Sequence, residues 1–165
     1  MHTSITLIGM AGAGKTSIGK VLSSRLRKRF VDSDQEIERE LSMSLQDVLL
    51  EKGKEKFLEI EKQTILNLKF EEIILSTGGS VIFSEDSMNH ICRNSLVFYL
   101  KVRFEKILER VINLDNRGFI KESDRTIEQS FHDREPLYEK YADYIIENDD
   151  IIEVCIQKIE EILDR

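Results

Sequence analysis

A glycine-rich loop near the amino terminus places the strongest constraint on this chain. Residues 9–16 read G-M-A-G-A-G-K-T and match the pattern G-x-x-x-x-G-K-[ST] at every fixed position. Glycine lets the backbone turn tightly, so successive N–H groups can point into one concavity that accepts phosphate oxygens. The lysine of such a loop reaches the β- and γ-phosphates, and the hydroxyl that follows it ligates Mg²⁺.

The residues on either side of this loop strengthen the prediction. The apolar run 5–8 before it is typical of a buried strand, and apolar residues recur at helical spacing after it. A helix that starts at the loop adds its positive dipole end to the phosphate site. The alternative is a glycine-rich turn that binds nothing, but chance should produce the pattern in well under ~1% of such chains. We therefore predict nucleotide binding, although the loop alone does not separate a kinase from a GTPase or a motor.

The size and charge of the chain limit its possible partners. Its 165 residues suit one domain, 1–165, with a core of its own. The net charge of −7 argues against a nucleic-acid partner, because phosphate backbones require a basic face. No apolar run approaches the ~18 residues of a membrane span, and the short run before the loop is no signal peptide. We expect a cytoplasmic monomer with a small-molecule substrate and no membrane partner.

Strand and helix patterns alternate along the whole chain. This alternation predicts a three-layer α/β/α fold, a five-stranded parallel sheet with helices on both faces. The polar segment 113–123 contains Arg117 and is expected to be a mobile lid whose arginine moves onto the phosphates. The alternative for Arg117 is a solvent-facing side chain in a loop. The expected strands are 5–8, 30–34, 72–80, 96–100 and 144–146, and the expected helices are 15–29, 35–50, 54–68, 84–93, 104–114, 124–142 and 151–163.

Two acidic residues follow the second apolar run. Asp32 and Asp34 are two apart, so in a strand both side chains project from one face. If this strand lies beside the first strand, both can point toward the phosphate loop. One carboxylate could then hold Mg²⁺ through water while the other accepts a proton from an attacking hydroxyl. The alternative is a helix cap at Asp34 with a spare acid in the turn.

Two further stretches give weaker predictions. The strand that starts at 72 ends in Gly78-Gly79, which would let a substrate approach the backbone at the carboxyl end of the sheet. A plain turn is the alternative. Glu61 lies in the strongly helical segment 54–68, and its residue type alone places it on the surface.

Taken together, these segments resemble the shikimate kinases, small enzymes of the P-loop nucleoside-monophosphate-kinase-like group. The resemblance covers nearly the whole chain, with the motifs in the order and spacing of the family. The matching stretches are G-M-A-G-A-G-K-T at 9–16, F-V-D-S-D at 30–34, G-x-x-x-F at 53–57 with Glu61, S-T-G-G at 76–79 and R-E-P-L-Y-x-x-Y-A-D at 134–143.

The resemblance implies an activity and a role for each matching residue. The family phosphorylates the 3-hydroxyl of shikimate with ATP and Mg²⁺, in aromatic amino acid biosynthesis. By the same resemblance, Lys15, Asp34 and Arg117 are catalytic. The resemblance also implies that ATP is bound by Gly12, Ala13, Gly14, Lys15, Thr16 and Ser17, with Arg110 stacking on adenine. It implies Mg²⁺ ligation by Thr16 and Asp32. It implies acceptor binding by Asp34, Gly78, Gly79 and Arg134, with Arg134 on the carboxylate.

Three positions depart from the family pattern. Leu58 replaces an arginine that pairs with the shikimate carboxylate, and leucine cannot make that oriented bidentate contact. Its loss should cost roughly 2–5 kcal/mol unless another group, such as Lys54 or Lys56, compensates. Ser80 stands where a third glycine is usual, and residues 117–120 read R-G-F-I instead of R-P-L-L.

These departures leave three functional hypotheses. The first is a shikimate kinase. The second is a related kinase whose acceptor is another polyol or sugar acid, which Leu58 favours. The third is a nucleotide-binding protein that has lost catalysis, which the intact Lys15, Asp32, Asp34 and Arg117 disfavour.

Overall fold

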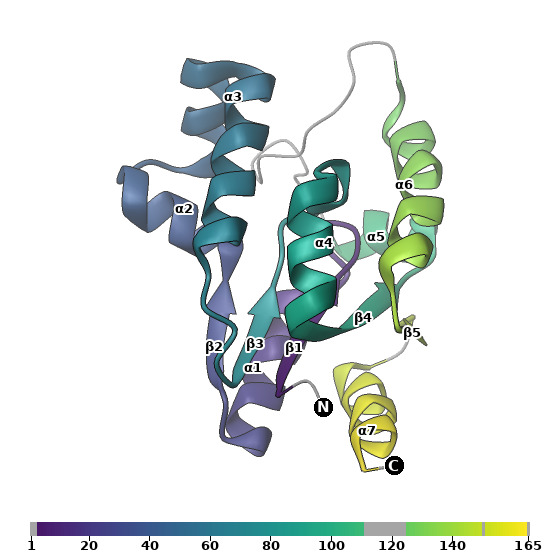
Figure 1. The fold of residues 1–165 in the computed structure, drawn as a ribbon. Helices are drawn as coiled ribbons and strands as arrows, with labels where there is room; N and C mark the ends of the chain where they lie inside the picture. The colour runs from purple at the N-terminus through teal and green to yellow at the C-terminus, as the bar shows by residue number, and fades with distance from the viewer. Residues whose placement is uncertain (1–2, 111–124, 150, 165) are drawn as a thin grey trace.

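The centre of the molecule is one parallel sheet. The computed structural model describes residues 3–110, 125–149 and 151–164. All strand pairings are parallel, and the order across the sheet is β2-β3-β1-β4-β5 (Figure 1). This confirms the predicted fold class. The strands are β1 (Ser4–Ile8), β2 (Arg29–Asp32), β3 (Ile73–Ser76), β4 (Ser95–Lys101) and β5 (Tyr144–Glu147).

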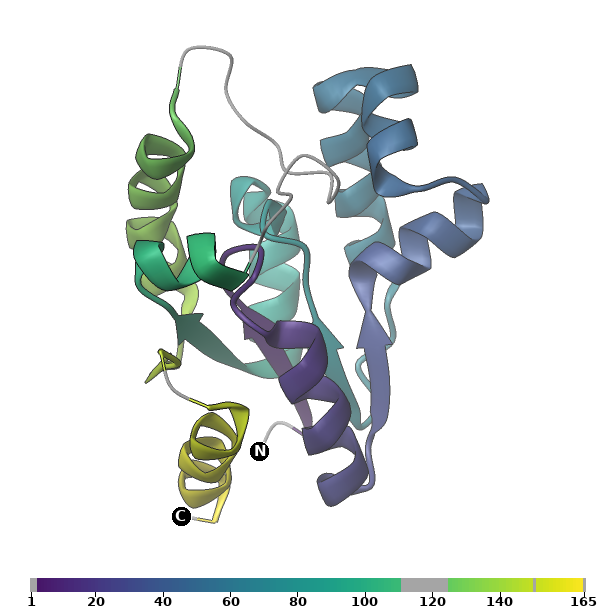
Figure 2. The same cartoon turned by 180° about the vertical axis from the view of Figure 1, so that it is seen from behind.

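Helices cover both faces of this sheet. One face carries α3, α4 and α6, and the other carries α1, α5 and α7 (Figures 1 and 2). None of the helices in the described residues is both long and apolar enough to cross a membrane. The helices are α1 (Lys15–Leu26), α2 (Ser33–Leu41), α3 (Leu45–Asn67), α4 (Glu85–Asn94), α5 (Phe104–Arg110), α6 (Ile127–Tyr141) and α7 (Ile152–Leu163), with a short 3₁₀ turn, η1 (Val81–Phe83).

The two sides of the sheet hold separate cores because side chains alternate along a strand. In β4, Phe98 and Leu100 join the core beneath α1 and α7, while Val97 and Tyr99 join the core beneath α3 and α4. Every residue of β1 is buried, as expected for a parallel strand covered on both faces. The continuous apolar runs that predicted the strands are therefore a direct result of this two-sided burial.

The predicted strand 30–34 is shorter in the structure. β2 ends at Asp32, and Asp34 lies in the first turn of α2, so the expectation that both acids project from one strand is wrong. Asp32 itself caps α2, because its carboxylate accepts hydrogen bonds from the backbone N–H groups of Asp34 and Gln35, at 3.1 and 3.4 Å. The cap satisfies two amides at the start of a helix, and this favours ending the strand two residues earlier.

The segment from α2 to α3 forms a small unit with its own apolar cluster. Ile37 of α2 packs with Leu45, Val48 and Phe57 of α3, and Leu58 lies against this cluster. Residues 42–44 separate the two helices, so the expected helix 35–50 is interrupted there. Gly53 adopts a φ of 79° inside α3 and produces the predicted interruption.

Pro136 lies inside α6, and the helix continues through this position to Tyr141. Tertiary contacts hold the following turn in place. The ring of Tyr138 stacks on Tyr99 with 5.0 Å between centroids, and its hydroxyl donates to the carbonyl of Gly79 at 2.6 Å. These contacts offset the hydrogen bond that proline cannot make.

Candidate active site

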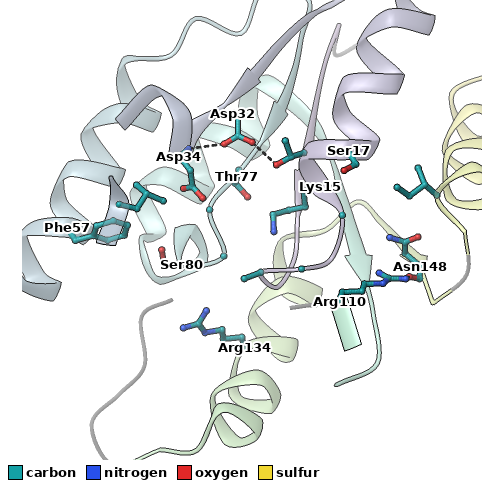
Figure 3. Close-up of a pocket in the computed structure, with 18 of the residues that line it drawn as sticks. Lys15, Ser17, Asp32, Asp34, Phe57, Thr77, Ser80, Arg110, Arg134 and Asn148 are labelled. Carbon is teal, nitrogen blue, oxygen red and sulfur yellow. Dashed lines mark hydrogen bonds between the residues drawn. The ribbon is translucent and has the colours of Figure 1, made fainter. Parts of the chain in front are cut away.

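A cleft of about 650 Å³ lies at the carboxyl end of the sheet. Parallel α/β sheets place their ligands at this edge, beyond the ends of the strands. The loop after β1, the junction of β2 and α2, the turn after β3 and helix α6 all contribute to its walls (Figure 3). The predicted site residues that line it are Gly12, Gly14, Lys15, Thr16, Ser17, Asp32, Asp34, Gly78, Gly79, Arg110 and Arg134.

Two predicted site residues are not among those that line the cleft. Ala13 is fully buried below the loop, where its N–H donates to the carbonyl of Met10 at 3.0 Å. Arg117 and the predicted lid 113–123 lie outside the described residues.

The loop after β1 turns on glycines in the left-handed region. Gly9 and Gly14 have φ values of 145° and 89°, and a Cβ on Gly9 would lie 2.8 Å from the carbonyl oxygen of Leu100. Larger residues would meet both backbone strain and this contact. Gly14 is also the residue before α1, so the amino end of that helix opens into the cleft.

Lys15 lies at the centre of the cleft (Figure 3). Its ammonium donates to the carbonyl oxygens of Gly9 and Met10 at 2.7 and 2.9 Å. Burial lowers the pKa of Lys15 to about 8, against the opposing effect of Asp34 and Asp32. The side chain is therefore charged at neutral pH and stands where a phosphate cradled by the loop would meet it.

Thr16 and Asp32 form a pair of oxygen ligands. The Thr16 hydroxyl donates to the Asp32 carboxylate at 2.7 Å (Figure 3). The described part of the chain holds no group of three or more His, Cys, Asp or Glu side chains arranged for a metal ion. A hydroxyl and one carboxylate nevertheless suit Mg²⁺, which keeps several waters and takes further oxygens from substrate phosphates.

Asp34 faces the same cleft from the first turn of α2. Burial raises the pKa of Asp34 to about 6, with the neighbouring charge of Asp32 as the next cause and Lys15 opposing both. A carboxylate of this pKa is mostly ionised at pH 7, yet it takes a proton more readily than an exposed aspartate. Asp34 is therefore suited to act as a general base.

The turn after β3 brings two carboxylates together. A Cβ on Gly78 would lie 2.5 Å from Glu61 Oε1 and 2.6 Å from Asp34 Oδ1. Only glycine leaves room for both at this position. Glu61 is 2% exposed, so the expectation that it lies on the surface is wrong. Residue type alone could not show that the Glu61 side of α3 packs against the turn after β3.

We expect Gly78→Ala to lower kcat/KM at least about 100-fold, because the methyl group displaces Asp34 and misplacement by 1 Å can cost that much. Gly79→Ala is the matched comparison. A Cβ there meets its nearest atoms at 3.4–3.6 Å, which are ordinary contact distances, so we expect a loss of less than about tenfold. Steady-state kinetics of the two variants test this difference, and equal losses would contradict the steric explanation.

Arg134 reaches the acceptor side of the cleft from α6 and is 3% exposed. Its guanidinium lies over the ring of Phe83, 5.0 Å from the centroid, and 4.0 Å from the sulfur of Met10. A guanidinium stacked on an aromatic face is held in a defined orientation. In Figure 3 it points into the same space as Lys15 and Asp34.

The end of the cleft opposite Arg134 is lined by Arg110, Asn148 and Ile151. Arg110 donates to the carbonyl of Asn148 at 2.8 Å, and the Asn148 amide donates to the carbonyl of Ala13 at 2.8 Å. Ile151 also lines this end and is 69% exposed. A guanidinium and an exposed apolar side chain are suited to hold a flat base between them. The sequence alone did not identify Asn148 or Ile151, since neither belongs to a recognisable motif, and it marked Ser80 only as a departure from the family pattern.

Comparison with known proteins identifies relatives along the full chain. The family model described as shikimate kinase matches residues 11–164. The shikimate kinase of Dictyoglomus turgidum is 36% identical over 171 residues, covering 99% of each chain. That of Colwellia psychrerythraea is 37% identical over 165 residues, covering 97% of this chain and 96% of the relative.

Solved structures agree with the sequence comparison. The structure of shikimate kinase from Acinetobacter baumannii in complex with shikimate superposes with a TM-score of 0.89 at 30% identity, covering 99% of this chain and 93% of that one. Shikimate kinase from Aquifex aeolicus gives a TM-score of 0.82 at 27% identity, with 98% and 96% coverage.

Proposed function

The chain belongs to the shikimate kinase family, and on that premise we propose that it transfers the γ-phosphoryl group of ATP to the 3-hydroxyl of shikimate. The products are shikimate 3-phosphate and ADP. The observation that carries this proposal is the convergence of Lys15, Asp34 and Arg134 on one cleft. A cation for phosphates, a base for a hydroxyl and a guanidinium for a carboxylate are the groups that this reaction needs.

The nucleotide occupies the end of the cleft formed by the glycine loop. Backbone N–H groups of Gly12 and residues 14–17 and the amino end of α1 hold its phosphates, and Arg110 lies against the base. Lys15 exchanges its contacts with the carbonyls of Gly9 and Met10 for phosphate oxygens. We also assign Arg117, from the predicted lid, to the transferred phosphoryl group.

Thr16 and Asp32 would hold Mg²⁺. When bound with ATP, the ion neutralises charge on the phosphate oxygens. Asp32 is fixed for this role by its capping of α2 and by the hydrogen bond from Thr16.

The acceptor lies between Asp34, the Gly78–Gly79 turn and Arg134. Asp34 orients the attacking hydroxyl and takes its proton as the bond to phosphorus forms, because its raised pKa of about 6 makes it a better base than a free carboxylate. Arg134 binds the carboxylate of the acceptor. Tyr138 supports the turn from below through its hydrogen bond to the Gly79 carbonyl.

A related kinase with a different acceptor is the second candidate, and one observation favours it. Leu58 packs against the apolar cluster of α2 and α3 and brings no charge to the cleft. Lys54 and Lys56, the other cations considered, are exposed and do not line the cleft. Arg134 is therefore the arginine that we assign to an acceptor carboxylate.

Coupled measurement of ADP formation separates the two candidates. Purified protein with Mg²⁺ and ATP is assayed with shikimate and with a panel of sugar acids and polyols. We expect the highest kcat/KM with shikimate, at a kcat in the kinase range of roughly 1–100 s⁻¹. A higher kcat/KM with another panel member would support the second candidate. Binding of ATP without turnover of any acceptor would support a non-catalytic protein.

We expect Leu58→Arg to lower the KM for shikimate about tenfold or more, because a second guanidinium can pair with the carboxylate. The same change should leave the KM for ATP unaltered. Leu58→Met, which keeps the apolar packing without a charge, is the matched control. An unchanged KM for shikimate in the arginine variant would show that position 58 does not reach the acceptor.

We further propose that the enzyme is a cytoplasmic monomer. Gel filtration with light scattering tests the oligomeric state, and a stable dimer at micromolar concentration would contradict it.

A further inference from the structure

A buried acid lies directly behind the acceptor turn. Glu61, on α3, is 2% exposed, and its two carboxyl oxygens lie 3.0 and 2.8 Å from the hydroxyl of Ser80. Ser80 is 7% exposed and lines the cleft. The two residues therefore connect the interior of α3 with the wall that an acceptor touches.

Charged groups from several elements face Glu61. Asp34 approaches from α2, Arg134 from α6 and Lys15 from the first turn of α1. Lys62, the next residue on α3, pairs instead with Asp86 of α4 at 2.7 Å. Glu61 takes part in no ion pair within the described residues. Burial raises the pKa of Glu61 to about 8, the charge of Asp34 adds to this, and the hydrogen bond from Ser80 opposes it.

The residue one helical turn earlier explains why Glu61 differs from an ordinary buried carboxylate. Residues three apart on a helix are neighbours, so an arginine at position 58 could pair with Glu61. Leu58 packs into the apolar cluster and cannot do so. A guanidinium has donors and no acceptor, so it stabilises the ionised carboxylate and cannot accept from the O–H of the neutral acid. The Ser80 hydroxyl can donate to a carboxylate or accept from a carboxylic acid, so it satisfies both forms.

We propose that Ser80 and Glu61 form a hydroxyl–carboxylic acid pair that replaces an arginine–glutamate ion pair and determines the affinity of this site for an anionic acceptor. Glu61 and Ser80 are positioning residues in this scheme. An ion pair of arginine and glutamate has no net charge. A protonated Glu61 beside Leu58 has no net charge either, so the acceptor meets the same total charge in both cases. Ionised Glu61 adds a negative charge beside Asp34 and repels the acceptor carboxylate.

This inference rests on the proposed function and predicts a specific pH dependence. The acceptor binds while Glu61 is protonated, so affinity is complete below the pKa of Glu61 and falls as pH rises through it. Between pH 7 and 9, around a pKa of about 8, we expect the KM for shikimate to rise about tenfold. The Glu61→Gln variant keeps the shape of the neutral acid, so its KM for shikimate should stay constant between pH 7 and 9.

Two comparisons separate this effect from other titrations. Burial also lowers the pKa of Lys15 to about 8, but Lys15 is assigned to the nucleotide side, so its titration should change the KM for ATP and should persist in Glu61→Gln. Ser80→Ala removes a hydrogen bond that lowers the pKa of Glu61, so the rise in the shikimate KM should move to higher pH. Glu59→Gln, on the exposed side of α3, should keep the wild-type profile.

A second measurement observes the acid directly. In protein labelled with ¹³C at the glutamate carboxyl carbons, we expect one resonance that titrates near pH 8 and is missing from Glu61→Gln. Titration of that resonance below pH 6, or a shikimate KM that is equally flat in wild type and variant, would overturn the inference. If another panel acceptor turns over and shikimate does not, the proposed function fails, and the same profile is then measured with that acceptor.

Discussion

Replacement of Lys15 by alanine is expected to lower kcat/KM by about 10³-fold or more. Lys15 is a buried cation that lines the cleft. In the proposed mechanism, charge develops on phosphate oxygens beside it during transfer. Removing one preorganised hydrogen-bond donor from such a site lowers kcat by a factor of about 10²–10³. Removing a full positive charge is expected to lower it further. Steady-state kinetics measure the loss, and calorimetry with ATP should show weaker nucleotide binding as well.

Controls for the Lys15 variant address its structural role. Its ammonium also bonds the carbonyls of Gly9 and Met10, so the melting temperature of the variant must be compared with that of the wild type. Lys20→Ala, on the exposed side of the same helix, removes an equal charge away from the cleft and should retain activity. A Lys15→Ala protein with more than a tenth of wild-type kcat/KM would contradict the assignment.

The Asp34→Asn variant should lose about 10²–10⁴ in kcat and keep its affinity for ATP. Asparagine fills the same space but cannot take a proton from the acceptor hydroxyl. In the proposed mechanism, ATP contacts Lys15 and the glycine loop and makes no direct contact with this carboxylate. Single-turnover kinetics with saturating shikimate isolate the chemical step, and titration calorimetry reports ATP binding.

The stability of Asp34→Asn provides an independent check. Burial and the charge of Asp32 raise the pKa of Asp34 in the folded protein. The ionised Asp34 side chain therefore lowers the free energy of unfolding at every pH above the unfolded-state pKa. The variant should therefore melt at a higher temperature than the wild type at pH 7–8. Glu36→Gln, in the same helical turn, is the matched control for kinetics. Full activity of Asp34→Asn would remove the general base from the mechanism.

Much of the fold follows from local sequence patterns. The apolar runs at β1 and β4 predict strands because parallel strands are buried on both faces, and the loop 9–16 fixes the start of α1. Strand and helix then alternate with little choice of topology, since crossover connections are right-handed. Local signals were less reliable at element ends, where capping by Asp32 moved Asp34 from the expected strand into α2.

The acceptor side of the site was harder to predict because its key contacts are between distant segments. Glu61 and Ser80 are 19 residues apart, and no local pattern shows that they meet. The burial of Glu61 depends on how α3 packs against the turn after β3, which is a tertiary property. Asn148 supports the phosphate loop across 135 residues in the same way. Motifs identified the cleft residues that we assign to phosphate, but packing decides which groups lie behind them.

The most direct test is the identity of the product formed from ATP and shikimate. After incubation with Mg²⁺, ³¹P spectroscopy and mass spectrometry should detect one equivalent of shikimate 3-phosphate for each ADP, at a rate of roughly 1–100 s⁻¹ per enzyme. ADP formed at the same rate with and without shikimate, and no phosphorylated shikimate, would contradict the account.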